Sequence, residues 1–201
     1  DSGIEWIGEI PAHWEVKKLK YQTALISDRL MANESDLKFI GMENIESWSG
    51  KYLSKNEDTA EGLAGYFQKG DILFGKLRPY LAKVYLAIEE GICSTEFNIY
   101  RCKTNSLARY YQYLFLSYKF IDLISSSTYG ARMPRASSSY IGEQYLPVPA
   151  YDEQQEIAFV LDKYSNEIDK GIHLFRTQIQ TLKEYKTTLI NEAVTGKIKV
   201  Y

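Results

Sequence analysis

Cysteine, histidine and long apolar runs are scarce in this chain of 201 residues. Cys93 and Cys102 form no CxxC pair, and His13 and His173 lie far apart, so the sequence predicts neither a disulfide framework nor a metal cluster. No run reaches the roughly 18 apolar residues that a membrane helix needs, and the first residues lack the basic start and apolar centre of a signal peptide. We therefore expect a folded cytoplasmic protein with reduced, structural thiols and no membrane partner.

Motifs of nucleotide and hydrolase chemistry are also missing. The sequence contains no GxGxxG, no HExxH and no GxSxG, and the VTGK stretch at residues 194–197 lacks the remaining residues of a phosphate-binding loop. Carboxylate pairs always occur among 26 Asp and Glu residues, but no spacing singles out one pair. The sequence therefore predicts no catalytic residue, no cofactor and no metal in this chain.

The net charge of −2 conceals an uneven distribution of charge along the chain. Residues 61–135 carry 10 Lys and Arg against 6 Asp and Glu, a net of +4, while residues 1–60 and 136–201 sum to −4 and −2. A basic stretch of this kind fits a nucleic-acid surface and a solvated basic face about equally well. Charge alone leaves both interpretations open.

Residues 1–150 predict an α+β or mostly β domain, and the mixed α+β form is the fold class expected here. Short apolar or alternating runs between Gly, Asn, Ser and Asp residues predict strands at 38–43, 70–74, 83–88 and 97–102. In residues 106–127, Leu, Ile and aromatic residues recur at near-helical spacing, which predicts one helix with a wide apolar face. This aromatic stripe is expected to be part of the core.

Residues 151–201 predict a long helix with a short C-terminal tail. Asp152 and Gln155 fit a capping box, and Gly196 fits the position that ends a helix. Apolar residues recur every seven positions and, with their neighbours, form a coiled-coil seam of Ile157, Leu161, Tyr164, Ile168, Ile172, Phe175, Ile179, Leu182, Tyr185 and Leu189.

The heptad phase runs through Gly171 without a shift, which favours one continuous helix of about 66 Å over a hairpin. A seam of this length needs another helix of similar length as its partner, and the sequence contains no second one. The partner is expected in another copy of the chain, another protein or a missing part of a longer polypeptide. A helix folded over its own domain is the remaining alternative.

Three stretches place polar and cationic groups where strands end. Lys76 and Arg78 follow an apolar strand and precede Pro79, an arrangement that directs cations at phosphates. The loop 129–141 carries Arg132, Arg135 and the hydroxyl of Ser137, which suit base edges and phosphates. Thr95 stands at the start of another strand, where an ordinary turn would explain a polar residue equally well. The composition of loop 129–141 also fits a mobile loop exposed to solvent.

Several stretches together resemble the specificity subunits of Type I restriction-modification systems. They follow in order over almost the whole chain: WIGEIPAHWEVKKLK (6–20), GMENIE (41–46), FQKGDILFGKLRPYLAKV (67–84), GICSTEFNIYR (91–101), GARMPR (130–135), LPVPAYDEQQEIAFVLD (146–162) and LINEAVTGKI (189–198). One departure is Pro149-Ala150-Tyr151, where that family often has Pro-Pro-Leu.

The resemblance implies a DNA-reading target recognition domain, residues 1–150, and a spacer helix within residues 151–201. It implies that this chain does no chemistry, reads one half of a bipartite double-stranded DNA site and docks methyltransferase subunits, which bring S-adenosylmethionine. Restriction subunits would join in a restriction complex. This chain holds one half of the usual two-half subunit and is expected to form a homodimer through the helix or to belong to a longer subunit.

The residues expected to contact DNA on this reading are Lys76, Arg78, Tyr80, Thr95, Lys103, Arg132, Arg135 and Ser137. Two alternatives stay open. A nuclease or methyltransferase fragment would modify DNA by itself, given S-adenosylmethionine or a divalent ion. A protein-interaction module would use the long helix and have no DNA role.

Overall fold

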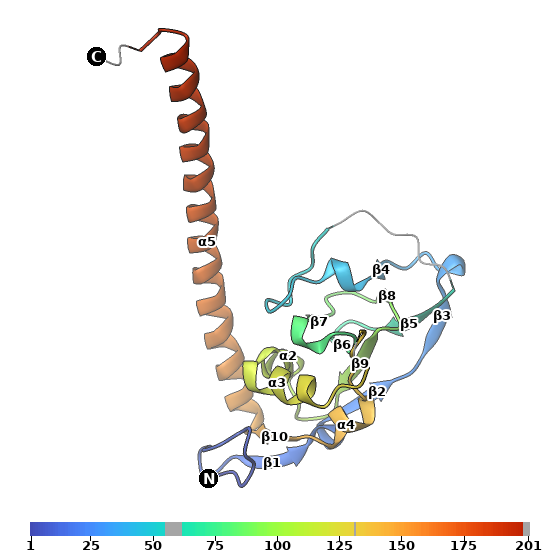
Figure 1. Cartoon of the computed structure of the whole chain (residues 1–201). Helices are drawn as coiled ribbons and strands as arrows, with labels where there is room; N and C mark the ends of the chain where they lie inside the picture. Colours follow the sequence, from blue (N-terminus) through green and yellow to red (C-terminus); the bar gives the residue numbers. More distant parts are fainter. Residues whose placement is uncertain (55–61, 131, 199–201) are drawn as a thin grey trace. The chain divides into compact units, whose positions relative to one another are not determined.

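The computed structural model of the chain describes residues 1–54, 62–130 and 132–198. Figure 1 shows its elements, which fall into a first unit, Asp1–Ala158, and a second unit, Phe159–Tyr201. The long helix α5 (Tyr151–Val194) begins inside the first unit. The compact domain therefore extends two helical turns beyond residue 150.

Most strands of the first unit belong to two four-stranded sheets. One has the order β2–β9–β6–β7, with bounds Thr23–Ile26, Phe97–Cys102, Ile72–Gly75 and Val84–Leu86. The other has the order β3–β5–β8–β4, with bounds Arg29–Met31, Leu63–Phe67, Gly91–Cys93 and Phe39–Ile40. β1 (Glu15–Lys18) pairs separately with β10 (Tyr145–Val148). In the described strands, β4 and β8 run parallel and the other pairs run antiparallel.

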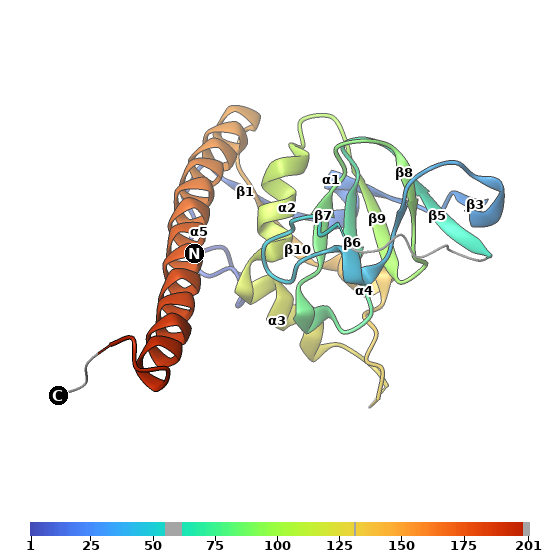
Figure 2. The same ribbon diagram turned by 90° about the horizontal axis from the view of Figure 1, so that it is seen from above.

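Short helices connect or cover these strands. The α-helices are α1 (Leu19–Gln22), α2 (Ala108–Leu116), α3 (Tyr118–Ser126) and α4 (Ser138–Glu143). Single 3₁₀ turns occur at η1 (Ala32–Glu34), η2 (Met42–Asn44) and η3 (Pro79–Leu81). Figure 2 shows α2 and α3 on one side of β7, β6 and β9, and β8, β5 and β3 on the other side.

The central strand β6 is buried on both faces. Ile72 and Phe74 pack with α2 and α3, whereas Leu73 packs with residues of β5, β8 and β9 on the opposite side, because successive side chains of a strand point to opposite faces. The ring of Phe115 lies edge-on to Phe74, with ring centroids 5.7 Å apart, and stacks on Phe120 at 5.2 Å. This aromatic core holds β6 and β9 in place.

The region predicted as one helix, residues 106–127, forms two helices instead. Ser117 has extended backbone angles, φ −66° and ψ 139°, and separates α2 from α3. The break leaves Tyr118 exposed but brings Phe120, Ile121 and Ile124 into the same core as α2. Burial of two apolar faces against one sheet therefore overrides the helical phase of the sequence.

The mixed α/β fold is confirmed, and the predicted strands are found with adjusted ends. Strand 97–102 is β9, and strands 70–74 and 83–88 correspond to β6 and β7. The predicted strand 38–43 is wrong in its second half: β4 ends at Ile40 and η2 follows. The Asn44 side chain accepts a hydrogen bond from the Gly41 N–H at 2.8 Å, and such local bonds compete with strand pairing.

The predicted cap of the long helix is also wrong. The helix begins at Tyr151, so Asp152 lies inside the first turn rather than before it. Glu153 accepts a hydrogen bond from the Ala150 N–H at 3.4 Å. The buried Gln154 amide donates to Pro149 O and Asn105 O at 3.0 and 3.2 Å and accepts from the Leu107 N–H at 2.8 Å. These bonds tie the start of α5 to the domain.

The helix is continuous through Gly171, as predicted, and ends at Val194. Gly196 has φ +73°, and the N–H groups of Gly196 and Lys197 donate to the carbonyls of Ala193 and Glu192 at 3.2 and 2.8 Å, the bonds of a Schellman motif. The predicted tail lies partly outside the described residues. Within the described residues, no helix combines the length and hydropathy that a membrane crossing requires.

Candidate nucleic-acid interface

Three segments far apart in sequence meet where β6 ends and β9 begins. The Lys76 N–H donates to Glu96 O at 2.9 Å, and Lys76 O accepts from the Ala136 N–H at 2.9 Å. The Arg78 N–H donates to Pro134 O at 2.8 Å. Backbone hydrogen bonds thus fix the strand end, the β8–β9 turn and the loop before α4 against one another.

Arg78 occupies an unusual backbone conformation at this place. Its φ of +50° lies in the left-handed region, and Ala82 has φ +47° at the other end of the same turn. Pro79 between them is buried, while the Arg78 side chain and Tyr80 are exposed. Non-glycine residues held in this region carry a local conformational cost and cluster at functional sites, so the turn presents Arg78 and Tyr80 to solvent in a defined geometry.

Arg135 forms a two-bond ion pair with Glu96. The Nε of Arg135 donates to Oε2 at 3.1 Å, and Nη2 donates to Oε1 at 2.7 Å. The hydrogen bond from Arg135 lowers the pKa of the Glu96 carboxyl, and Lys76 contributes a smaller electrostatic effect. Both partners stay partly exposed, at 37% for the Arg135 side chain and 25% for Glu96.

A small cavity of about 170 Å³ opens beside Lys76 and Thr95. Sequence reasoning missed Arg29, which lines it, because one Arg in an acidic N-terminal third carries no pattern that marks a site. The lining combines two cations, one acid and several hydroxyls with apolar residues: Leu25, Ile26, Ser27, Asp28, Arg29, Gly65, Lys76, Thr95, Phe97, Asn98, Ile99 and Ser138.

The remaining residues of the loop before α4 belong to the same region. Arg132 is exposed three residues before Arg135. Ser137 caps α4 by accepting a hydrogen bond from the Tyr140 N–H at 3.4 Å, and its hydroxyl lies 2.7 Å from that of Ser139. We use the name recognition edge for Lys76, Arg78, Tyr80, Thr95, Arg132, Arg135 and Ser137.

Lys103 is not brought together with the recognition edge. It follows β9, whereas Thr95 precedes it, and the six residues of that strand span about 20 Å. The Nζ of Lys103 donates to Lys20 O at 2.8 Å. Lys103 therefore lies at the opposite end of the sheet from the other predicted contacts.

Two further cations of the basic middle region serve the fold. Arg101 forms two hydrogen bonds of 2.7 Å with the buried carboxylate of Asp71, and Lys83 donates to the carbonyls of Met42 and Ile45 at 2.6 and 2.8 Å. Counting charges along the sequence therefore overstated the cationic surface, because paired cations are invisible to a linear count.

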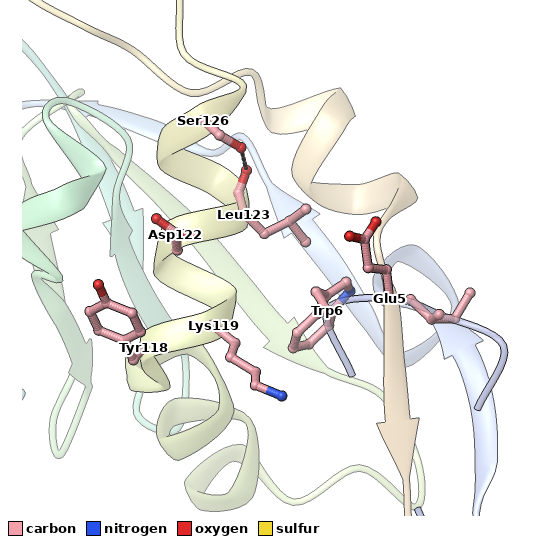
Figure 3. Close-up of a pocket in the computed structure, with 8 residues that line it drawn as sticks. Glu5, Trp6, Tyr118, Lys119, Asp122, Leu123 and Ser126 are labelled. Atoms are coloured by element: carbon pink, nitrogen blue, oxygen red, sulfur yellow. Dashed lines mark hydrogen bonds between the residues drawn. The ribbon is translucent and has the colours of Figure 1, made fainter. Parts of the chain in front are cut away.

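A wider pocket lies elsewhere on the first unit. It has a volume of about 450 Å³ and is lined by Ile4, Glu5, Trp6, Tyr118, Lys119, Asp122, Leu123 and Ser126. Figure 3 shows this pocket between the N-terminal segment and α3. These lining residues contain two acids and one lysine but no cysteine or histidine, and none is a predicted DNA contact.

The chain matches a known protein family over most of its length. The model described as "Type I restriction modification DNA specificity domain" matches residues 13–174. This chain belongs to that family.

Two curated relatives are themselves named as specificity subunits. The chain is 26% identical over 199 residues to the Type I restriction enzyme EcoDI specificity subunit of Escherichia coli, covering 94% of this chain and 43% of the relative. It is 25% identical over 177 residues to the MjaIX specificity subunit of Methanocaldococcus jannaschii, covering 81% of this chain and 40% of the relative. The chain thus spans less than half the length of these relatives.

Solved structures share the fold of this specificity domain. An HsdS subunit from Thermoanaerobacter tengcongensis superposes with a TM-score of 0.70 at 21% identity, covering 92% of this chain and 50% of that one. A chain from a structure described as showing complex assembly and conformational transition of the type I R-M system gives 0.72 at 20% identity, covering 96% and 51%. The predicted family and the mixed domain with its long C-terminal helix are confirmed.

The seam of the specificity domain's long helix is open to solvent in this chain. Ile157 packs against the core of the first unit, but the seam residues from the second unit are exposed: Leu161, Tyr164, Ile168, Ile172, Phe175, Ile179, Leu182, Tyr185 and Leu189. An exposed heptad stripe of this length is the geometry of a coiled-coil strand without its partner.

The two cysteines of the specificity domain form no disulfide; Cys93 is buried and Cys102 is half-buried. Burial raises the pKa of both Cys93 and Cys102 to about 12, so neither is a reactive thiolate at neutral pH. Within the described parts of the chain, no group of three or more His, Cys, Asp or Glu residues is arranged to hold a metal ion.

Proposed function

We propose that this specificity domain reads one half of a bipartite double-stranded DNA site through the recognition edge. The observation that carries the proposal is the convergence of Lys76, Arg78 and Arg135 from two separate segments on one hydrogen-bonded surface, in a chain that belongs to a DNA specificity family. Cations on a rigid backbone suit phosphates, and an Arg fork suits base edges.

We further propose that the chain is not an enzyme and serves a complex. Methyltransferase subunits would bind S-adenosylmethionine and modify the DNA, and restriction subunits would join in a restriction complex, all in the cytoplasm. Two observations support this division of labour: the relatives are named specificity subunits, and the burial of both thiols keeps them out of covalent chemistry.

The partner of the helical seam is proposed to be a second copy of this chain. The exposed heptads call for a helix of equal length, and the chain spans less than half of the named relatives. Two copies would supply two identical reading domains. The DNA site would then have two inverted halves.

Selection from a randomised duplex pool tests the reading function. The full chain, alone and with methyltransferase subunits, is incubated with the pool, and bound duplexes are sequenced. We expect enrichment of a split motif with inverted halves. Enrichment of one half-motif alone would exclude the proposed homodimer but support DNA reading. A pool that stays random would refute DNA reading by this chain.

The salt dependence of binding locates the DNA on the domain. Lys76→Ala should weaken binding to all duplexes alike and reduce the salt slope by about one unit, because one phosphate contact is lost. Lys69→Ala is the matched control: it removes the same charge from the exposed turn at the other end of β6. An equal loss of slope in both variants would mean a diffuse cationic surface instead of the recognition edge.

The same titration decides the prediction for Lys103. A lower slope in Lys103→Ala would extend the DNA path along β9 to the far end of the sheet. An unchanged slope would leave Lys103 as a fold contact to Lys20 O.

A further inference from the structure

We propose that Glu96 is a positioning residue that holds the guanidinium of Arg135 so that its free edge reads a guanine in the major groove. The inference rests on the proposed DNA-reading function and adds to it a named base and the residue that orients the reader.

The geometry of the pair leaves the reading edge of Arg135 unused. Of the five N–H donors of a guanidinium, Glu96 takes the one on Nε and one on Nη2. Two N–H groups on Nη1 and one on Nη2 remain. One N–H of Nη1 and the remaining N–H of Nη2 point from the same end of the plane and match the O6 and N7 acceptors of guanine, which lie side by side in the major groove.

The electrostatics of the pair favour a base over a phosphate. The carboxylate of Glu96 offsets the charge of Arg135 at hydrogen-bond distance and would repel a phosphate that approached the same guanidinium. Lys76 and Arg78 lie on the neighbouring segment and supply positive charge for contacts to the DNA phosphates. The division matches the general pattern in which backbone contacts position a protein and base contacts specify the sequence.

Both members of the pair are anchored to the same strand end. The Lys76 N–H binds Glu96 O, while Lys76 O binds the N–H of Ala136, the residue after Arg135. Arg135 also exchanges two backbone hydrogen bonds with Tyr129, at 3.1 and 3.3 Å. The side chain of a free Arg loses considerable rotamer entropy on binding, and this scaffold removes much of that loss before DNA arrives.

A second ion pair of the same shape provides the contrast. Arg101 also uses Nε and Nη2, but its partner Asp71 is buried and accepts the Gln68 N–H of a turn at 2.8 Å. Arg101 lies within β9, near the end of the strand away from the recognition edge. The two arginine side chains are equally exposed, at 37%, so the burial of the acid and the position in the sheet distinguish the pairs. Arg101 is tied to a buried turn residue of the fold, whereas Arg135 lies at the recognition edge.

Repeating the pool selection with full-length variants tests the inference. Arg135→Lys keeps the charge but loses the fork, and should abolish the preference for one guanine in the selected half-motif, by on the order of tenfold or more. Affinity for random duplexes should stay close to that of the wild type. Glu96→Gln should weaken the same preference at the same base pair by a smaller factor.

The double variant and the contrasting pair separate positioning from stability. Because Glu96 acts through Arg135, adding Glu96→Gln to Arg135→Lys should cause no further change in the motif. Arg101→Lys should lower the thermal stability and leave the motif intact. An unchanged motif in Arg135→Lys, or a Glu96→Gln effect at a different base pair, would overturn the inference while the reading function stands. A wild-type selection that enriches nothing would overturn both.

Discussion

Phe115 and Phe175 are both phenylalanines, but one is buried and the other is exposed. Phe115 in α2 is fully buried, whereas Phe175 in α5 is 64% exposed. Phe115 is covered by strands and a helix that come from distant parts of the chain. Phe175 belongs to a stripe that repeats every seven residues and stays exposed among the described residues. The first unit thus buries its apolar residues within its own fold, whereas the second leaves a row of them exposed.

The largest expected effect comes from removing the buried ring. Phe115→Ala should destabilise the first unit by about 3–5 kcal/mol, because it removes packing against Phe74 and Phe120 and leaves a cavity. Phe175→Ala should leave that unfolding transition in place. Urea unfolding followed by tryptophan fluorescence measures this, since Trp6, Trp14 and Trp48 all lie in the first unit.

If Phe175→Ala shifted the fluorescence transition as far as Phe115→Ala did, the contrast between the two units would collapse. Comparing several protein concentrations separates any contribution from dimerisation, because stability gained from a second copy depends on concentration.

A charge in the seam should act on assembly alone. Phe175→Lys places an ammonium group in the proposed dimer interface and should convert the dimer into a monomer, as light scattering of the full chain would show. Thr177→Lys adds the same charge two residues away, about 200° around the helix, and should leave the mass unchanged. Equal masses for both variants would exclude the seam as the assembly surface.

Lowering the pH should weaken ion pairs of the first unit. Glu143 binds both Lys18 and Lys20, and these hydrogen bonds lower its pKa from 4.5 to about 2. Because the folded pKa lies below the unfolded value, this carboxylate stabilises the fold above pH 4.5, and its contribution is lost as the pH falls toward 2.

A side-chain NMR titration of Glu143 measures this pKa directly. The Glu143→Gln variant should lose stability at neutral pH and show a weaker dependence on pH in that acid window. A Glu143 that titrates near its usual value would mean that the two lysines do not hold α4 against β1 and α1 in solution.

The smallest expected effect is a gain in the second unit. A Cβ at Gly171 would meet no other atom within 4 Å, and Ala is favoured over Gly inside a helix by about 1 kcal/mol. Gly171→Ala should therefore raise the helix content and thermal stability of α5 in circular dichroism. A loss of stability would indicate that the partner helix approaches closely at Gly171.

Much of the fold followed from local patterns. Strand 97–102 and the helix running through Gly171 to a stop at Gly196 were predicted with almost correct ends, because their apolar periods persist over whole elements. The break at Ser117 and the start of the long helix were missed, since they depend on packing and on hydrogen bonds from Gln154 to residues far away in sequence.

The candidate site was likewise predictable from the sequence only in part. The sequence by itself determined which cations and hydroxyls stand in loops, that the family resemblance is to DNA specificity subunits, and that a long apolar stripe lacks a partner. The tertiary structure alone decided that Lys76 joins Arg135 through backbone bonds and that Lys103 lies apart. It also decided that Arg101 forms an ion pair with Asp71. A heptad repeat is a local property of the chain, whereas the pairing of two charges depends on where the fold brings distant segments together.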